Sequence, residues 1–430
     1  MNNKIELNQF VFLNLRLKKN DSMNKLSTKI LVVIFSIISI HSIAQNSDTY
    51  DQTLGQELNA ITTSVPFLMI APDSRSGAMG DAGVAISPDG YSQHWNSSKL
   101  AFVNQSMGLS ISYTPWLKKL VDDINLAYVS GYYRLDENQT LGAGLRYFSM
   151  GNINFTDENG GPLGSFAPHE FALDGSYNRK LSENFALGIV GRFILSNLTG
   201  GTGVNGSEQT QAGKSVAVDI NGFYTRPMKV SGYEGNWAAG FNLSNIGAKL
   251  GYTEDDKNFI PTNLKIGAAG TIEIDAYNSI SATFEINKLL VPTPPVYWLS
   301  GDTLPNGSIS DGISPEYIYA GMDNDVSIAQ GMFQSFYDAP GGFKEEMQEI
   351  AYSLGFEYWY AKQFAVRAGY FHENQYKGNR KYFTAGVGLK MNVFGLDFSY
   401  LIPAGSFNNS PLSNTWRFSL VFDLEAISNQ

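Results

Sequence analysis

Three evenly spaced glycines are the first residues whose types and spacing could do chemistry. Gly77, Gly80 and Gly83 lie in the stretch APDSRSGAMGDAG, and a glycine-rich loop can bind phosphate through its backbone N–H groups. A phosphate loop lies between a buried strand and a helix, and it usually carries a Lys-Ser or Lys-Thr pair. Neither feature is present around these glycines. Their spacing therefore argues against a nucleotide site.

Histidines and paired aspartates offer two other chemistries. Beyond residue 44, histidine occurs only at His94, His169 and His372, and a Ser-His-acid hydrolase would need one of them beside a serine. His169 and His372 are each followed by glutamate, but neither has a matched serine signature. Asp323 and Asp325 could join a calcium site, but the glycine and bidentate glutamate of a calcium loop are missing at the required spacing. We expect no catalytic residue, no metal and no cofactor, with a lipid-modifying hydrolase as an open alternative.

The composition limits the classes of partner. Of the 430 residues, 16% are charged and 13% are aromatic, and 43 are glycines, whereas soluble domains are typically about a quarter charged. This balance suits a surface that faces something other than water. The net charge of -10 argues against nucleic acid as a partner. The absence of cysteine removes disulfides, thiol catalysis and a lipoprotein anchor.

The first 44 residues have the pattern of an export signal. Lys25 and Lys29 precede the apolar run ILVVIFSIISI, and Ser42 and Ala44 form a small-x-small cleavage site. The eleven apolar residues are too few for a membrane-spanning helix. We predict a signal peptide over residues 1–44, cleaved after Ala44, with Met23 as a possible true start.

The rest of the chain alternates between apolar and polar residues. In EFALDGSYNRK, for example, Phe171, Leu173 and Tyr177 share one face and Asp174 lies on the other, which is typical of a half-buried strand. About fourteen such segments of roughly ten residues suit tilted membrane-spanning strands. They begin near residues 107, 123, 139, 168, 183, 213, 236, 263, 278, 348, 363, 380, 393 and 414.

The connections decide the architecture. Short turns such as LDENQ and KLSEN alternate with long polar stretches such as 198–212 and 289–346, as in outer-membrane barrels with short periplasmic turns and long external loops. We predict an all-β membrane protein, a 14-stranded antiparallel transmembrane β-barrel over residues 106–425. A soluble sandwich or propeller is the competing architecture. Residues 45–105 would begin in the periplasm and thread the lumen as a plug.

Small residues fill the middle of that plug segment, and they let the backbone pack closely in a crowded lumen. The residues that we assign to the plug are Arg75, Gly77, Gly80, Asp81, Gly83, Trp95 and Asn96. We expect the charged residues that face the lumen to pair with one another and with the plug. They are Arg146, Arg192, Glu357, Arg367, Asp397 and Arg417.

The external loop 289–346 is too long for a simple connection, and loops of this length are usually functional. Apolar residues recur at helical spacing after Asp325, a good N-cap, and Gly341 and Gly342 end the run. The helix buries its own stripe against the barrel, presents it to another protein, or does both on different faces, because aromatics and Met are favoured at interface cores. The candidate partner-binding or cargo-binding residues are Trp116, Leu117, Trp298, Met332, Phe333, Phe336 and Tyr337.

Two stretches carry a family resemblance. Asp81-Ala82-Gly83, then Trp95-Asn96 followed by Leu100-Ala101, and then fourteen alternating strands resemble the FadL-like outer-membrane barrels, and more narrowly the PorV family of the type IX protein secretion system. The second stretch is SIAQGMFQSFYDAPGGFKEEMQEI, residues 327–350, which resembles the PorV loop. This chain has WNSS where family members usually have Trp-Asn-Pro-Ala.

The resemblance implies a non-catalytic subunit of a secretion machine, with no cofactor. Such proteins receive cargo that carries a C-terminal β-domain from a large outer-membrane translocon barrel, and they deliver it to a surface sortase. Outer-membrane lipids would surround the barrel. The rival interpretation is a FadL-like channel for small hydrophobic molecules, which would need an apolar pocket beneath the loops and a kinked strand that opens sideways.

Overall fold

The computed structural model describes residues 59–156, 161–198, 200, 210–253, 257–304, 307–312, 314–404 and 410–428. The predicted signal peptide, residues 1–44, lies outside these ranges. So does the beginning of the predicted plug segment, up to residue 58.

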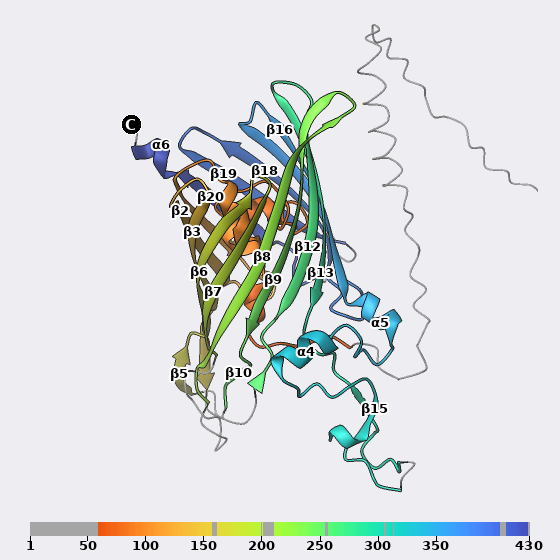
Figure 1. Cartoon of the computed structure of the whole chain (residues 1–430). Coiled ribbons are helices and arrows are strands. Elements are labelled where there is room, and N and C mark those ends of the chain that lie inside the picture. The colour runs from red at the N-terminus through yellow and green to blue at the C-terminus, as the bar shows by residue number, and fades with distance from the viewer. Residues whose placement is uncertain are drawn as a thin grey trace, which may run out of the picture. The chain divides into compact units, whose positions relative to one another are not determined.

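Fourteen antiparallel strands close into a barrel (Figure 1), which confirms the predicted fold. Closure comes from the pairing of the first strand with the last, from Gly108 opposite Asp423 to Tyr113 opposite Phe418. The strands in order are β1 (Met107–Pro115), β2 (Ile124–Arg134), β3 (Gln139–Met150), β6 (His169–Ser182), β7 (Phe185–Asn197), β8 (Gly213–Val230), β9 (Tyr233–Gly247), β12 (Asn263–Glu273), β13 (Asn278–Leu289), β16 (Ile350–Tyr360), β17 (Phe364–His372), β18 (Lys381–Lys390), β19 (Phe394–Pro403) and β20 (Trp416–Asp423).

The alternation of residue types sets which face of each strand points into the barrel. In β7, Ile189 and Phe193 are exposed on the outside, whereas Val190, Arg192 and Ile194 are buried. Apolar residues outside and polar or small residues inside are the pattern of a barrel that spans a bilayer. Among the described residues, no helix combines the length and the apolar character needed to cross a membrane.

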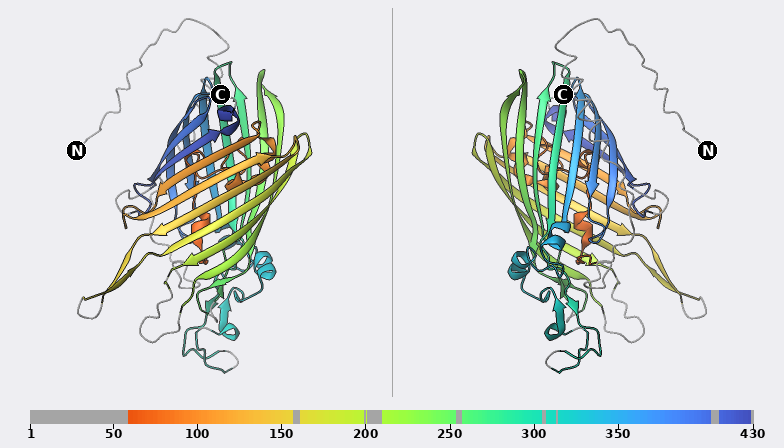
Figure 2. Two further views of the ribbon diagram at one scale, coloured as in Figure 1. Left: turned by 90° about the vertical axis from the view of Figure 1, so that its left-hand side faces the viewer. Right: turned by 90° about the vertical axis from the view of Figure 1, so that its right-hand side faces the viewer.

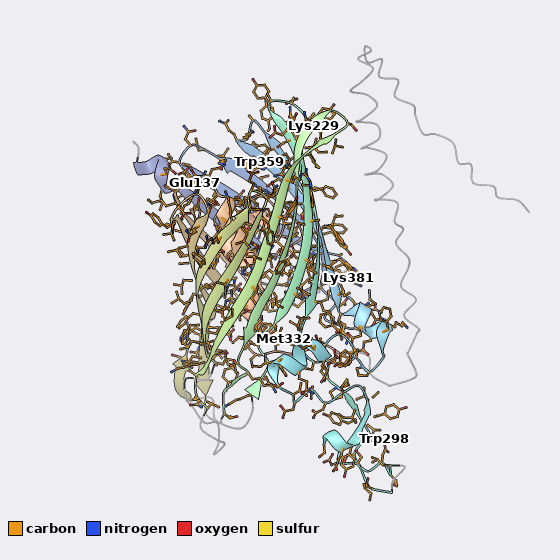
Figure 3. The ribbon with its side chains drawn as sticks, in the orientation of Figure 1. Glu137, Lys229, Trp298, Met332, Trp359 and Lys381 are labelled. Carbon is orange, nitrogen blue, oxygen red and sulfur yellow. The ribbon has the colours of Figure 1, made fainter. Side chains whose placement is uncertain are left out.

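The two ends of the barrel differ. Short turns join the strands at one end, which we call the turn end, and long connections join them at the other, the loop end (Figures 1 and 2). In Figure 3, Glu137, Lys229 and Trp359 mark the turn end, and Met332 and Trp298 lie at the loop end. The long connections carry three two-stranded sheets, which are β4 (Ile153–Thr156) with β5 (Pro162–Phe166), β10 (Leu250–Gly251) with β11 (Lys257–Asn258), and β14 (Val296–Tyr297) with β15 (Ile318–Ala320).

Residues 64–103, which we call the inner segment, lie inside the barrel (Figure 2). They form four short helices, which are η1 (Pro66–Met69), α2 (Ser74–Gly77), α3 (Ser92–Trp95) and η2 (Ser97–Phe102). Asp73 caps α2 by accepting a hydrogen bond from the Ser76 N–H at 2.8 Å. Most residues of the segment are buried.

The path of the inner segment differs from our expectation that it starts at the turn end. Asn59 bonds to the backbone of Tyr376 and to Glu345, both in loop-end connections. The segment leaves the lumen beside Arg134, whose guanidinium donates to the Asn104 carbonyl at 3.0 Å next to a short turn. The chain therefore crosses the lumen from the loop end to the turn end. The order of residues alone does not reveal this direction, because it depends on pairings with loops more than 280 residues away.

Candidate functional site

The long connection between β13 and β16 builds the most distinctive surface of the loop end. After the β14–β15 sheet and the short η3 (Pro315–Tyr317), it forms α4 (Ile328–Gln334) and α5 (Phe343–Gln348). The N-cap of α4 is Ser327, whose hydroxyl accepts from the Gln330 N–H. We predicted Asp325 for that role, but its carboxylate instead pairs with Lys249 at 2.9 Å.

The predicted apolar stripe of α4 and the turn after it is only partly exposed, because its three aromatic residues face outward while Ile328 and Met332 are half-buried. The buried residues of the helix are Gly331 and Gln334. A Cβ atom at Gly331 would lie 2.9 Å from the Phe259 ring, so this small face is what allows the helix to lie against its neighbours. The Gln334 side chain donates to the Asp323 carbonyl at 2.7 Å. Ile328 and Met332 are half-buried and the three aromatic residues are exposed, so features of both interpretations are present on different faces.

Large apolar side chains are exposed on and beside both loop helices. We call this set the loop patch, and it consists of Phe333, Phe336, Tyr337, Phe343 and Met347, exposed by 71%, 49%, 64%, 81% and 43%. Met332, which we also predicted, is half-buried. Clusters of exposed aromatic and Met side chains are typical of surfaces that bind another molecule.

A buried group of charges, which we call the anchor cluster, holds α5 to the barrel. Lys288 at the end of β13 pairs with Glu346 at 3.0 Å and with Glu349 at 2.7 Å. Lys377 in the next loop pairs with Glu349 at 3.0 Å and with Glu345. Each of these side chains is at most 15% exposed, so the ion pairs are poorly screened and fix the geometry of α5.

Asp338, between the two loop helices, is also buried, and no cation of the described residues forms an ion pair with it. Its carboxylate accepts a hydrogen bond from the Thr293 N–H at 3.2 Å. Burial, together with the nearby Glu346 and Glu349 carboxylates, raises the pKa of Asp338 to about 7. The loop as it lies in this structure, which we call the closed loop, therefore favours the protonated form of Asp338.

The other predicted partner-binding residues lie elsewhere. Trp116, in the connection from β1 to β2, packs against an apolar cluster that contains Phe67 and Phe148. Leu117 is next to it, with a left-handed backbone at φ 51°. Trp298 contacts the Tyr319 ring edge-on, with ring centres 4.9 Å apart. The structure therefore does not bring all seven predicted residues into one site.

The inner segment is joined to the barrel by buried ion pairs. Arg75 binds Glu357 through two hydrogen bonds of 2.9 and 3.0 Å and pairs with Asp89 at 2.9 Å. Glu357 also accepts from Arg367 at 2.7 Å. Asp81 pairs with Arg417 at 3.1 Å. Glu357, Arg367, Asp397 and Arg417 thus pair with one another or with the segment, as the sequence predicted.

Arg146 is the exception among those lumen residues, because no carboxylate is its partner. Its guanidinium donates to the Leu68 carbonyl at 2.7 Å and contacts His94. Arg192, in contrast, pairs with Asp174 at 2.6 Å and with Asp219 at 2.9 Å.

The spaced glycines serve close packing. A Cβ atom at Gly83 would lie 2.2 Å from the Trp95 ring, and one at Gly77 would lie 2.5 Å from Arg417. Gly80 has φ +72° and lies against the backbone of β17. The N–H groups of Gly80 and Gly83 already donate to Thr384 and Glu285. A phosphate would find these donors occupied.

Several lumen contacts were not predicted from the sequence. Asp73 accepts a hydrogen bond from the Trp95 indole N–H at 2.6 Å, and Asn96 donates to the Val84 and Gly222 carbonyls. Glu285 accepts from two backbone N–H groups of the segment. Only Asp73 had a local signal, since an aspartate before Ser-Arg-Ser is a typical N-cap.

Comparison with known proteins decides the family. The family model described as "Type IX secretion system protein PorV" matches residues 53–296, more than half of the 430 residues. The chain belongs to the PorV family. The match covers the inner segment and strands β1 to β13. The loop stretch 327–350 lies beyond it, so the resemblance of that stretch stays a prediction.

The PorV-family chain is also similar to solved outer-membrane transporters, at low identity. The Pseudomonas putida toluene transporter TodX is 12% identical with a TM-score of 0.42, and the match covers 81% of this chain and 96% of TodX. A Pseudomonas aeruginosa FadL homologue is 10% identical with a TM-score of 0.42, over 85% and 99% of the two chains. No curated sequence matches the chain. Similarity at this level says nothing about what this protein binds.

The PorV family and the barrel fold place the protein in the outer membrane. The family is described as part of the type IX secretion system. The His169 and His372 imidazoles contact the Ala167 carbonyl and the Tyr370 hydroxyl, respectively. Within the described part of the chain, neither histidine bonds to a serine, so a Ser-His pair is not formed there.

Proposed function

We propose that this PorV-family protein receives secreted cargo with a C-terminal β-domain from the large translocon barrel and passes it to the surface sortase. The loop patch is the contact surface for the translocon or the cargo, and the barrel is its mount. The observation that supports the proposal is the exposed loop patch, on a connection whose α5 is held to the barrel by the buried anchor cluster.

The geometry supports a protein contact on energetic grounds. The loop patch exposes several large aromatic side chains on helices whose opposite faces are fixed to the barrel. A rigid aromatic anchor loses little conformational entropy when it binds, and such residues contribute most of the binding energy in many interfaces. No energy source or cofactor is needed for such a transfer.

The rival channel for small hydrophobic molecules would need free apolar space beneath the loops. The apolar cluster in that position is filled by side chains of the inner segment itself, with Phe67 stacked on Phe148 at 6.1 Å. β3 pairs with β2 and β6 along its length without a register shift. Neither feature favours a sideways opening at β3, whereas the pairing of β8 with β9 shifts register between Val218 and Ile220.

A tagged pull-down from gently solubilised outer membranes tests the proposal. The triple variant F333A/F336A/Y337A removes the exposed aromatic side chains at the end of α4 and in the turn after it, and Q330A, an exposed polar residue of α4, is the matched control. We expect wild type and Q330A to recover a large translocon barrel or cargo that ends in a β-domain, and the triple variant to lose it while remaining folded. Recovery of the wild-type protein alone with bound fatty acid would overturn the proposal in favour of the channel.

A further inference from the structure

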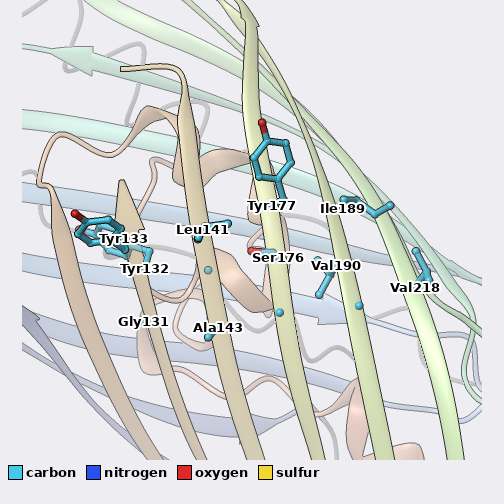
Figure 4. Close-up of a pocket in the computed structure, with 13 residues that line it drawn as sticks. Gly131, Tyr132, Tyr133, Leu141, Ala143, Ser176, Tyr177, Ile189, Val190 and Val218 are labelled. Carbon is cyan, nitrogen blue, oxygen red and sulfur yellow. The ribbon is translucent and has the colours of Figure 1, made fainter. Parts of the chain in front are cut away.

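The outer wall of the barrel carries an apolar groove that crosses strands β2 to β8 (Figure 4). Its volume is about 700 Å³. The floor consists of Gly131, Ala143, Gly175 and Gly191, which are direct cross-strand neighbours in successive strands. At the usual strand spacing of about 4.8 Å, a groove over five strands is about 19 Å long.

Large side chains form the wall of the groove nearer the turn end. Tyr133, Leu141, Tyr177 and Ile189 pair across the same strands, two residues beyond the floor. They are exposed by 53%, 42%, 38% and 52%. Because these side chains alternate with buried ones along each strand, the groove faces away from the lumen. In an outer-membrane barrel this face contacts lipid, so the ligand of the groove must be apolar and must come from the bilayer.

The polar atoms near the groove lie on its turn-end side. The hydroxyl of Tyr177 donates to Gln139, and Tyr side chains favour the level of lipid headgroups. Arg179 is four residues beyond Gly175 on β6, which places its Cα about 13 Å farther toward the turn end. Its side chain is on the outward face, and no hydrogen bond or ion pair joins it to another described residue at contact distance.

The surroundings of Arg179 leave its guanidinium available for an anion. The Asp136 carboxylate in the adjacent turn interacts electrostatically with Arg179. That carboxylate already accepts hydrogen bonds from the Asn138 N–H and from the Gln139 amide. Arginine binds phosphate with two parallel hydrogen bonds and is the preferred residue for such contacts. A cation at headgroup level above an apolar groove matches the chemistry of a phospholipid.

We propose that the groove binds one phospholipid of the periplasmic leaflet, with an acyl chain along the glycine floor and the phosphate at Arg179. The strands are tilted, so a groove perpendicular to them descends obliquely from the headgroup level into the hydrocarbon. The bound lipid fills a hollow that freely moving lipids would cover poorly. This site is separate from the loop patch and does not depend on the proposed role in secretion.

Native mass spectrometry of the full chain in detergent, titrated with dipalmitoyl phosphatidylethanolamine or dipalmitoylglycerol, tests the site. The variant G175L/G191L fills the groove, and both positions have no atom within 4 Å of an added Cβ. R179Q removes the cation. The matched control is A368L on β17, another outward small residue that lies between Phe356 and Ala385 on a different wall.

We expect the wild type and A368L to bind one phosphatidylethanolamine with equal affinity. G175L/G191L should bind it at least about tenfold more weakly, the effect of losing roughly two buried methylene groups. R179Q should weaken phosphatidylethanolamine but leave dipalmitoylglycerol unchanged. Equal losses in A368L and G175L/G191L would show a general lipid coat and overturn the proposal. The proposal would also fail if G175L/G191L released a partner barrel without changing lipid binding. It would fail as well if R179Q weakened the binding of both lipids equally.

Discussion

Glu357 lies between two arginines inside the barrel, one from the inner segment and one from the neighbouring strand. Its carboxylate is 3% exposed and accepts from Arg75 and Arg367. The pair with Arg75 joins parts of the chain 282 residues apart. Removing one member of a buried pair leaves the other charge uncompensated, and this costs much more than losing an exposed pair.

We predict that R75M and E357Q each lower the free energy of unfolding by about 3–5 kcal/mol. The double variant should cost less than the sum, because the unpaired charge is removed as well. Guanidinium unfolding in detergent micelles, followed by tryptophan fluorescence, measures all three. K229M, which breaks an ion pair that is 72% and 65% exposed, should change the value by less than about 1 kcal/mol. Additive effects of R75M and E357Q would show that the contact is energetically unimportant.

Gly83 lies so close to the Trp95 ring that no side chain fits at this position. A methyl group there would collide with the Trp95 ring, which is held by its hydrogen bond to Asp73. We predict that G83A lowers the free energy of unfolding by about 1–3 kcal/mol through overpacking. G395A, where an added Cβ meets only ordinary contacts of 3.7 and 3.9 Å, should be nearly neutral in the same unfolding assay. A neutral G83A would mean that the segment adjusts without cost.

At the scale of elements, local patterns predicted the strands well and the contacts between distant elements poorly. The fourteen strands follow from alternation within about ten residues, as in β7. The sequence could not decide which face of α4 points outward. The inward face is set by Gly331, which lies against Phe259, and no local sequence pattern indicates this distant partner. The anchor cluster joins Lys288, Glu349 and Lys377 from three separate segments. Such pairings are set by the closed barrel rather than by neighbouring residues.

The loop helices should respond to pH through Asp338. The closed loop keeps this carboxyl protonated up to about pH 7, whereas a released loop ionises it near the ordinary value of 3.8. Between these values the released state binds fewer protons, so the stability of the closed loop falls as pH rises. We predict at least a tenfold loss of amide protection in residues 328–349 from pH 5 to pH 8, since tenfold corresponds to about one pKa unit.

Hydrogen exchange, corrected for the intrinsic effect of pH, measures this loss of protection. D338N should remove most of the dependence and protect the loop better than wild type at pH 8. D325N, which replaces an exposed carboxylate of the same loop, should leave the pH dependence of protection unchanged. A wild-type loop with equal protection at both pH values would contradict the assignment to Asp338.

At the scale of the whole molecule, the inner segment connects the two ends of the barrel. Its described beginning, Asn59, bonds to loops at the loop end, and its last residues bond to Arg134 beside a turn. Because outer-membrane barrels have short turns in the periplasm and long loops outside, we expect the residues just before the inner segment to lie at the cell surface. The sequence suggested the opposite direction, because an exported chain is naturally drawn as entering a barrel from the periplasm.

Single cysteines can test this direction, because the chain has none of its own. Ala60 is exposed at the loop end, Tyr337 belongs to the loop patch, and Glu137 is exposed at the turn end. We predict that a membrane-impermeant maleimide labels A60C and Y337C in intact cells, and labels E137C only after the outer membrane is permeabilised. Labelling of Y337C without A60C in intact cells would show that the inner segment enters from the periplasm. Labelling of E137C alone in intact cells would mean that the barrel has the opposite orientation in the membrane. The assignment of the loop patch to the cell surface would then be wrong.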